Sequence, residues 1–168
     1  MRELPVRKNI RLKGYDYSNA GCYYITVCVK DRLELLWNGT VGAAFGRLSK
    51  EGLTPLSETG LVIDTEIKKI NSIYDCVEIV KYVIMPNHIH MIIALSEITD
   101  TYGRPKAAPT ISRILNKFKS SISKQLGYSI WQKLFHDHII RNDTEYKRIW
   151  QYIDENPGKW EEDEFYGH

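Results

Sequence analysis

The 168-residue chain has only three cysteines and no apolar run long enough to span a membrane. Cys22, Cys28 and Cys76 are odd in number and include no closely spaced pair, which argues against a disulfide framework and a zinc ribbon. The N-terminus is basic, but no long apolar segment follows it as in a secretory signal. We therefore predict a soluble, cytoplasmic protein without a membrane-spanning segment.

The sequence also lacks a nucleotide-binding motif. Glycines are frequent in residues 31–53, but this stretch has neither the Gly-Lys-Ser/Thr ending of a P-loop nor the strand-turn-helix context of a dinucleotide fingerprint. We expect no nucleotide cofactor. The length fits one domain with a sizeable core, and we predict a single domain over residues 1–168.

The formal net charge of +2 is small, but the charges are unevenly distributed. Residues 1–13 form a basic arm, and residues 161–168 form an acidic tail. A basic arm suits a polyanionic partner, although a solvated terminus of mixed charge is the commoner explanation. The cations of the arm are Arg2, Arg7, Lys8, Arg11 and Lys13.

Residues 85–95 contain two closely spaced histidines after a turn signal, Pro86-Asn87. Apolar residues run up to this turn and leave it again, as in a β-hairpin. Because side chains alternate along a strand, His88 and His90 share one face. Two adjacent imidazoles form half of a metal site, although a pair of surface histidines fits the same spacing.

Periodicity predicts the elements around this hairpin. The β-branched and aromatic residues 22–30 predict a central strand, and residues 77–85 predict the strand before the turn. A proline-containing helix start precedes apolar residues at helical spacing over residues 54–74. Residues 96–109 are typical of a flexible connector.

A second helix is predicted from Ile111, with Gly127 placed to end it. Away from its apolar stripe this segment carries cations and serines but no acid. Phosphate contact and a merely solvated face explain this pattern equally well. The cations are Arg113, Lys117, Lys119 and Lys124.

His136 and His138 form another alternating pair, within a stretch that we predict to be an irregular edge strand. This pair competes with the first as a metal site. We favour a structural or substrate-contacting role for it, because no clear hairpin surrounds it.

A capping box of Asn142 and Glu145 begins the last predicted helix, and Pro157 ends it. Tyr152 and Asn156 are one turn apart and lie on the same flank of its apolar stripe. If this helix packs across the histidine face, Asn156 supplies a third metal ligand and Tyr152 a nucleophile. A rim tyrosine and an asparagine C-cap fit the same positions.

Four motif blocks occur in order along the chain: Met-Pro-Asn-His-Ile-His at 85–90, Trp-Gln at 131–132, His-Ile-Ile-Arg-Asn at 138–142 and Tyr-Ile-Asp-Glu-Asn-Pro at 152–157. Arg-Leu-Lys-Gly-Tyr-Asp-Tyr at 11–17 precedes them. Together these blocks resemble the REP-associated tyrosine transposases, domesticated relatives of insertion-sequence transposases in the single-tyrosine HUH superfamily. The resemblance covers roughly residues 10–160.

The resemblance implies an α+β fold, a ferredoxin-like palm whose antiparallel sheet has helices packed mainly on one face. It implies that His88 and His90 bind a divalent metal, that Tyr152 is the nucleophile, and that Asn156 completes the metal site. Relatives outside this branch often have glutamine at the position of Asn156. The implied ion is Mg²⁺ or Mn²⁺, whereas the ligands by themselves would also accept zinc or nickel.

The implied reaction is cleavage of single-stranded DNA by Tyr152, which leaves a 5′-phosphotyrosine and a free 3′-hydroxyl, followed by rejoining to another strand. Substrates of the family are hairpins with a short adjoining single-stranded recognition tetranucleotide. We therefore expect hairpin or single-stranded DNA as the partner of a monomer or homodimer. The expected DNA contacts are Arg7, Lys8, Arg11, Lys13, Arg113, Lys117, Lys119, Lys124, His138 and Arg141.

Two other functional classes fit the same residues. A non-catalytic nucleic-acid-binding module would use the basic surfaces without forming a covalent adduct. A metal-dependent phosphohydrolase would use water in place of Tyr152 and would still need His88 and His90.

Overall fold

The computed structural model describes residues 19–38, 56–99, 102–103 and 105–166. The basic arm lies outside these residues, and with it the predictions for Arg7, Lys8, Arg11 and Lys13. No helix in the described part of the chain is long and apolar enough to cross a membrane.

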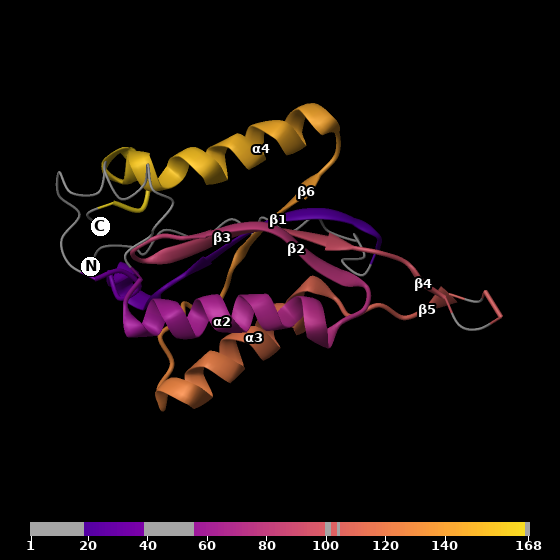
Figure 1. The fold of residues 1–168 in the computed structure, drawn as a ribbon, viewed down its shortest axis with the longest axis horizontal. Coiled ribbons are helices and arrows are strands. Elements are labelled where there is room, and N and C mark those ends of the chain that lie inside the picture. Colours follow the sequence, from indigo (N-terminus) through magenta and orange to yellow (C-terminus); the bar gives the residue numbers. More distant parts are fainter. Residues whose placement is uncertain (1–18, 39–55, 100–101, 104, 167–168) are drawn as a thin grey trace, which may run out of the picture.

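A four-stranded antiparallel sheet forms the centre of the molecule (Figure 1). Its strands follow the order β2-β3-β1-β6, so the predicted central strand and the histidine strand are both interior. The predicted α+β fold with an antiparallel sheet is thereby confirmed. The strands are β1 (Gly21–Cys28), β2 (Val77–Ile84), β3 (His88–Leu95) and β6 (His136–Ile140).

Strands β2 and β3 form the predicted histidine hairpin. The backbone N–H of Met85 donates to the carbonyl of His88 at 2.8 Å and closes the turn that contains Pro86 and Asn87. Along β3 only Ala94 is not fully buried. The strand is therefore covered on both of its faces.

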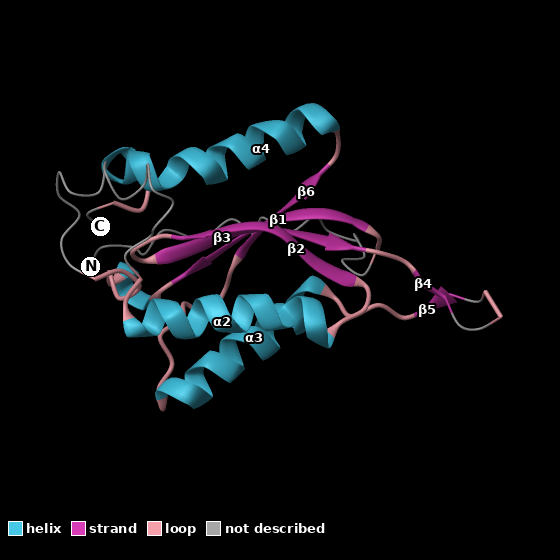
Figure 2. Ribbon diagram, viewed as in Figure 1, coloured by secondary structure: helices cyan, strands magenta, loops and turns pink. Residues whose placement is uncertain are grey.

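Helices cover both faces of the sheet unequally. In Figures 1 and 2, α2 (Glu58–Ile73) and α3 (Ile111–Leu126) lie below the sheet, and α4 (Asp143–Glu155) lies above it. Two of the three described α-helices thus share one face, as predicted. Beneath the sheet, Ile89 and Met91 are completely buried.

Side-chain caps set the ends of the two lower helices. Thr110 accepts a hydrogen bond from the N–H of Arg113 at 3.2 Å, and α3 ends at Gly127 with φ of 81°, the left-handed conformation predicted there. Ser57 accepts from Gly60 at 3.0 Å and caps α2. The predicted start of this helix at residues 54–55 is therefore wrong, and the helix begins at Glu58.

The predicted irregular edge strand divides into two parts. Trp131 forms an isolated bridge with Val29, and the regular strand β6 follows. Because β6 pairs with β1, its two histidines occupy an ordered edge strand.

The remaining described elements are short. The predicted connector contains a two-stranded hairpin of β4 (Ile98–Thr99) and β5 (Pro105–Lys106). A 3₁₀ turn, η1 (Lys30–Arg32), follows β1. After α4 the chain continues as the 3₁₀ segment η3 (Asn156–Glu162), so Pro157 ends the α-helix but not the helical path.

Candidate metal and tyrosine site

His88 and His90 lie side by side on the face of β3 that α4 covers. Their Nε2 atoms are 2.9 Å apart, and their ring centroids are 4.4 Å apart. Their exposed fractions are 0% and 1%. The prediction that the two imidazoles share one face is confirmed, and their converging nitrogens suit a shared cation.

Asn87 orients the ring of His88. The Asn87 side-chain amide donates to the carbonyls of Arg32 at 3.2 Å and Phe165 at 2.9 Å, so its Oδ1 is the acceptor 2.8 Å from His88 Nδ1. This network assigns the ring proton of His88 to Nδ1. The Nε2 lone pair is then available to a metal ion.

The ring of His90 is held from the neighbouring strand. Its Nδ1 lies 2.8 Å from the hydroxyl of Tyr24 and 2.9 Å from that of Thr26, both on β1. Hydroxyl groups accept a ring proton as readily as they donate one. These contacts fix the orientation of the imidazole, as the outer nitrogen of a metal-binding histidine requires.

Burial keeps both imidazoles neutral. Desolvation lowers the pKa of His90 to about 3. Desolvation, followed by the charges of His90 and Arg32, holds the pKa of His88 well below its ordinary value. The neutral imidazole is the form that binds a metal ion.

Asn156 contributes an unsatisfied oxygen at the end of α4. The residue is 4% exposed, and its buried Oδ1 has no hydrogen-bond partner among the described residues. Such an orphaned group costs about 1–3 kcal/mol. A cation would satisfy it, so the residue fits the predicted role of an oxygen ligand.

Asp163 is the site residue that sequence reasoning missed. Its Oδ2 lies 3.9 Å from Nε2 of His88, and its side chain is 2% exposed. With the two histidines it forms a group whose possible ligand atoms lie within 4.8 Å of one another. The sequence analysis assigned no site role to the acidic tail, and the signal that could have found Asp163 was the pair of aromatic residues around it, Trp160 and Phe165.

Those aromatic residues hold the acidic tail on the histidine face. Trp160 and Phe165 are buried, with ring centroids 5.9 Å and 4.5 Å from that of His88. Arg32 donates to the carbonyl of Glu164 at 3.2 Å and lies 4.9 Å from the Phe165 ring centroid. The described part of the tail is therefore a wall of the site.

Tyr152 extends from α4 toward the histidine pair within the same chain. Its ring centroid lies 5.3 Å from that of His90, and 41% of the residue is exposed. Desolvation and then the charge of Asp163 raise the pKa of Tyr152, whereas a hydrogen bond from Asn156 lowers it. The phenol is therefore protonated at neutral pH, and its ionisation requires help from the site.

A cavity of about 410 Å³ opens at this tyrosine. Its wall includes Tyr152, Asn156 and Asp163 together with three further acids and Lys159. The structure thus brings a phenol, an amide and a carboxylate to one cavity beside the two imidazoles.

Comparisons with known proteins agree with this arrangement. No family model matches the chain. An uncharacterized Haemophilus influenzae protein is 31% identical over 177 residues, which cover 95% of this chain and 93% of that protein. A second Haemophilus influenzae protein, whose name proposes a REP-associated tyrosine transposase, is 30% identical over 88 residues, or 49% of this chain and 50% of that protein.

The fold is also similar to a solved structure of a REP-associated tyrosine transposase bound to a REP hairpin. The TM-score is 0.61 at 23% identity, covering 89% of this chain and 74% of that one. The chain therefore has the fold of that transposase.

The cations predicted to contact DNA lie in different surroundings. Lys119 is buried, and its ammonium donates to the carbonyls of Gln132 at 2.9 Å and Leu134 at 3.3 Å. Its predicted place on an exposed face is therefore wrong, because the buried face of α3 is wider than its apolar stripe. The exposed cations of α3 are Arg113, Lys117 and Lys124, across the sheet from the histidine pair.

The other residues predicted to contact DNA, His138 and Arg141, lie where β6 leads into α4. His138 Nε2 lies 2.6 Å from the carboxylate of Glu145, which also accepts from the N–H of Arg141 at 2.9 Å. Asn142 accepts from the N–H of Glu145 at 2.9 Å, so half of the predicted capping box forms. Contact of His138 and Arg141 with DNA stays a prediction of the transposase assignment.

The second histidine pair lies outside the candidate metal site. Within the described residues, neither His136 nor His138 belongs to a group of His, Cys, Asp or Glu close enough to hold an ion. The contact with Glu145 fits a structural role for His138, which is one of the two roles predicted for this pair.

Proposed function

We propose that the chain is a metal-dependent single-stranded DNA endonuclease and strand transferase that acts on hairpin-containing DNA. The observation that carries the proposal is the position of Tyr152, whose ring lies 5.3 Å from His90 at a cavity shared with Asn156 and Asp163. Similarity over half of the chain to a protein whose name proposes a REP-associated tyrosine transposase supports DNA as the substrate. The relative of known structure is bound to a DNA hairpin of the REP type.

The metal ligands in this proposal are His88, His90 and Asn156, with Asp163 as an additional oxygen donor. The converging imidazole nitrogens and the orphaned oxygen of Asn156 fit a divalent ion. Two nitrogen donors and two oxygen donors are compatible with Mg²⁺ or Mn²⁺. When bound, such an ion polarises the phosphate that is to be cleaved.

Tyr152 performs the covalent step. Its phenolate oxygen attacks the backbone phosphorus, the bond from phosphorus to the 3′ oxygen breaks, and the product is a 5′-phosphotyrosine with a free 3′-hydroxyl. The phenol loses one proton and the 3′ oxygen gains one. Rejoining to another strand reverses these bonds, so the reaction consumes no nucleotide.

Ionisation of the phenol is the costly part of this step. An ordinary phenol is ionised about one part in a thousand at neutral pH, which corresponds to a deficit of about 4 kcal/mol. Burial raises the pKa of Tyr152 further. The Asp163 carboxylate accepts a hydrogen bond from this phenol and is placed to take its proton.

The role of Tyr152 as nucleophile is tested with a labelled DNA hairpin that carries a single-stranded flank. The protein is incubated with this DNA and Mn²⁺, and the products are separated by denaturing electrophoresis. We expect a covalent protein–DNA adduct that falls by more than about 1,000-fold in Tyr152→Phe, because no other group replaces the phenol. Tyr146→Phe is the matched control, since Tyr146 lies on the same helix and packs on Trp150 at 5.8 Å. It should form the adduct normally.

The same experiment separates the alternatives. Cleavage that persists in Tyr152→Phe without an adduct indicates a phosphohydrolase that uses water. An adduct that persists in this variant shows that another residue is the nucleophile. Binding of the hairpin without any cleavage by the unaltered chain indicates a non-catalytic module.

A further inference from the structure

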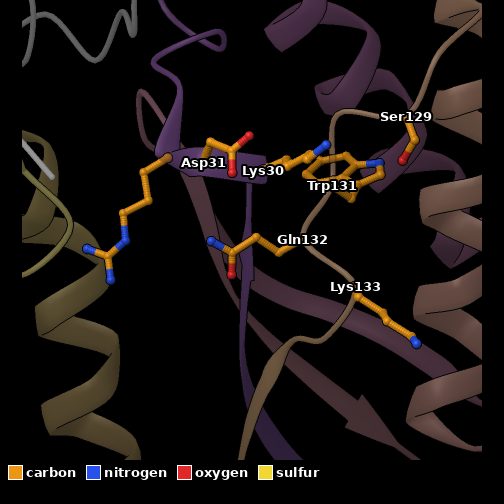
Figure 3. A pocket seen from close by; sticks show the side chains of 7 residues that line it. Lys30, Asp31, Ser129, Trp131, Gln132 and Lys133 are labelled. Carbon is orange, nitrogen blue, oxygen red and sulfur yellow. The ribbon is translucent and has the colours of Figure 1, made fainter. Parts of the chain in front are cut away.

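An open groove of about 910 Å³ lies where η1 meets the segment that leads from α3 to β6. We refer to it as the η1 groove. It is lined by residues 30–32 on one side and by residues 129 and 131–133 on the other. Figure 3 shows side chains from both segments extending around it.

Backbone pairing fixes the two sides of the η1 groove together. Val29 and Trp131 form an antiparallel bridge, and the N–H of Lys30 donates to the carbonyl of Ile130 at 2.7 Å. Backbone hydrogen bonds just beyond β1 therefore hold the two sides of the groove together.

Buried Lys119 supports the groove from below. Its ammonium donates to the carbonyls of Gln132 and Leu134, which flank Lys133 in the sequence. The backbone that presents the Gln132 and Lys133 side chains is thus anchored to α3.

The groove carries an excess of positive charge. Lys30, Arg32 and Lys133 line it together with a single acid, Asp31. Lys30 and Lys133 are exposed, and neither forms an ion pair with another described residue. Unpaired cations in a concave surface favour an anionic ligand.

Exposed apolar side chains flank these cations. Leu33, Tyr128 and Leu134 are 54%, 60% and 58% exposed, and each adjoins a lining residue in the sequence. Cations beside apolar and aromatic surface suit unpaired nucleotides, because phosphates take the charge and bases take the apolar contacts. Paired bases in a duplex are not available for such contacts.

Arg32 connects the η1 groove to the candidate site. It lines the groove, and its guanidinium reaches the Glu164 carbonyl and the ring of Phe165, which packs on His88. Asp31 and Arg32 both have φ of 54°, a left-handed conformation that costs side-chain-bearing residues about 1–3 kcal/mol. This sharp turn is what places Arg32 between the two surfaces.

We propose that the η1 groove binds an unpaired stretch of the substrate strand next to the phosphate that Tyr152 attacks. Lys30, Arg32 and Lys133 contact its phosphates, and the flanking apolar side chains contact its bases. The location of the DNA path rests on the proposed function. The single-strand preference rests on the groove itself.

Fluorescence anisotropy measures binding of a labelled 12-nucleotide oligothymidylate and tests this proposal. The measurement uses Tyr152→Phe protein in EDTA, so that no cleavage takes place. We expect the double variant Lys30→Gln with Lys133→Gln to bind about 10-fold more weakly and to show a smaller salt dependence. The charge-matched control is Lys68→Gln with Lys69→Gln, which removes two cations of α2 that are paired with Asp64 and Glu66. It should change the affinity less than about twofold.

Four outcomes would overturn the proposal. Unchanged affinity in the groove variant excludes the groove, and equal losses in the two double variants indicate unspecific charge attraction. An equal loss for a 12-base-pair duplex, or displacement of the oligonucleotide by polyglutamate at equal concentration, shows that unpaired DNA is not the preferred ligand. None of these results depends on adduct formation, so the groove and the proposed nucleophile succeed or fail separately.

Discussion

Burial of a charged side chain is costly unless a specific partner compensates for the lost solvation. Lys119 is the clearest case, because its ammonium lies beneath the sheet with two carbonyl acceptors. Desolvation lowers its pKa to about 8 from an ordinary value of 10.5. The buried charge therefore reduces stability at neutral pH while it anchors the backbone before β6.

The pKa of Lys119 predicts how stability changes with pH. The Lys119 ammonium of the folded state loses its proton at lower pH than that of the unfolded state. Between pH 8 and 10.5 the unfolded state therefore binds more protons than the folded state. The free energy of unfolding rises with pH in that window. The gain is on the order of 2 kcal/mol. Urea denaturation at pH 7.5 and about pH 10 should show this gain relative to Lys119→Met.

Lys124→Met provides the control for this measurement, since Lys124 is exposed on the same helix. This variant should follow the pH dependence of the unaltered chain. Identical pH profiles for the unaltered chain and Lys119→Met would contradict the prediction.

Sequence reasoning identified residues whose chemistry follows from local spacing. Alternation placed His88 and His90 on one face, and one helical turn joined Tyr152 to Asn156. It missed Asp163 because a carboxylate within a run of acids is indistinguishable from a solvated one until Trp160 and Phe165 are seen to pack. It misplaced Lys119 because helical spacing does not tell how wide the buried face is.

At the scale of elements, α4 decides whether the candidate site exists. The helix carries Tyr152, and Asn156 is its C-cap. Its N-terminus is held by Asn142, whose side chain accepts from Glu145 at 2.9 Å. The cap therefore stabilises the element that brings the phenol to the histidine pair.

Removal of this cap has a measurable cost. We expect Asn142→Ala to lower the free energy of unfolding by about 1 kcal/mol, because the N–H of Glu145 loses its acceptor. Asn142→Ser should retain most of the stability, since serine caps helices well. Equal losses for the two variants in urea denaturation would show that the cap is not the source of the effect.

The elements were predictable to the extent that their signals are local. The Pro86-Asn87 turn and the alternation after it defined the hairpin, and Gly127 marked the end of α3. The order of strands and the face chosen by α4 are long-range properties. They follow from pairing between β1, β3 and β6, which no short stretch of sequence encodes.

At the scale of the whole molecule, the proposed metal site joins three separate parts of the chain. His88 and His90 come from β3, Asn156 follows α4, and Asp163 comes from the acidic tail. An ion bound by all of them stabilises the folded state, because the unfolded chain does not hold these ligands together.

Thermal unfolding with and without Mn²⁺ tests this coupling. At an Mn²⁺ concentration of about 100 times Kd we expect about 2.7 kcal/mol of added stability, or a Tm rise of about 5–10 °C, and EDTA should abolish it. Asn156→Ala and Asp163→Asn should each reduce the rise. A full rise in either variant would remove that residue from the proposed ligand set.

Asp154→Asn is the matched control for the metal experiment. Asp154 is an exposed acid of α4 that pairs with Lys81 across the sheet edge. Its substitution removes a carboxylate without touching the cavity at Tyr152. The Mn²⁺-dependent rise in Tm should therefore be unchanged.

The packing of the acidic tail on the histidine pair also has a consequence for protein synthesis. The ribosome makes the histidine strand first, then the helix with Tyr152, and last the turn that contains Asp163 and Phe165. A nascent chain that has reached only β3 holds two imidazoles but neither the phenol nor the acid. Under the proposed function, such a chain is unable to cut DNA, and nuclease activity begins only after the segment up to residue 165 has emerged.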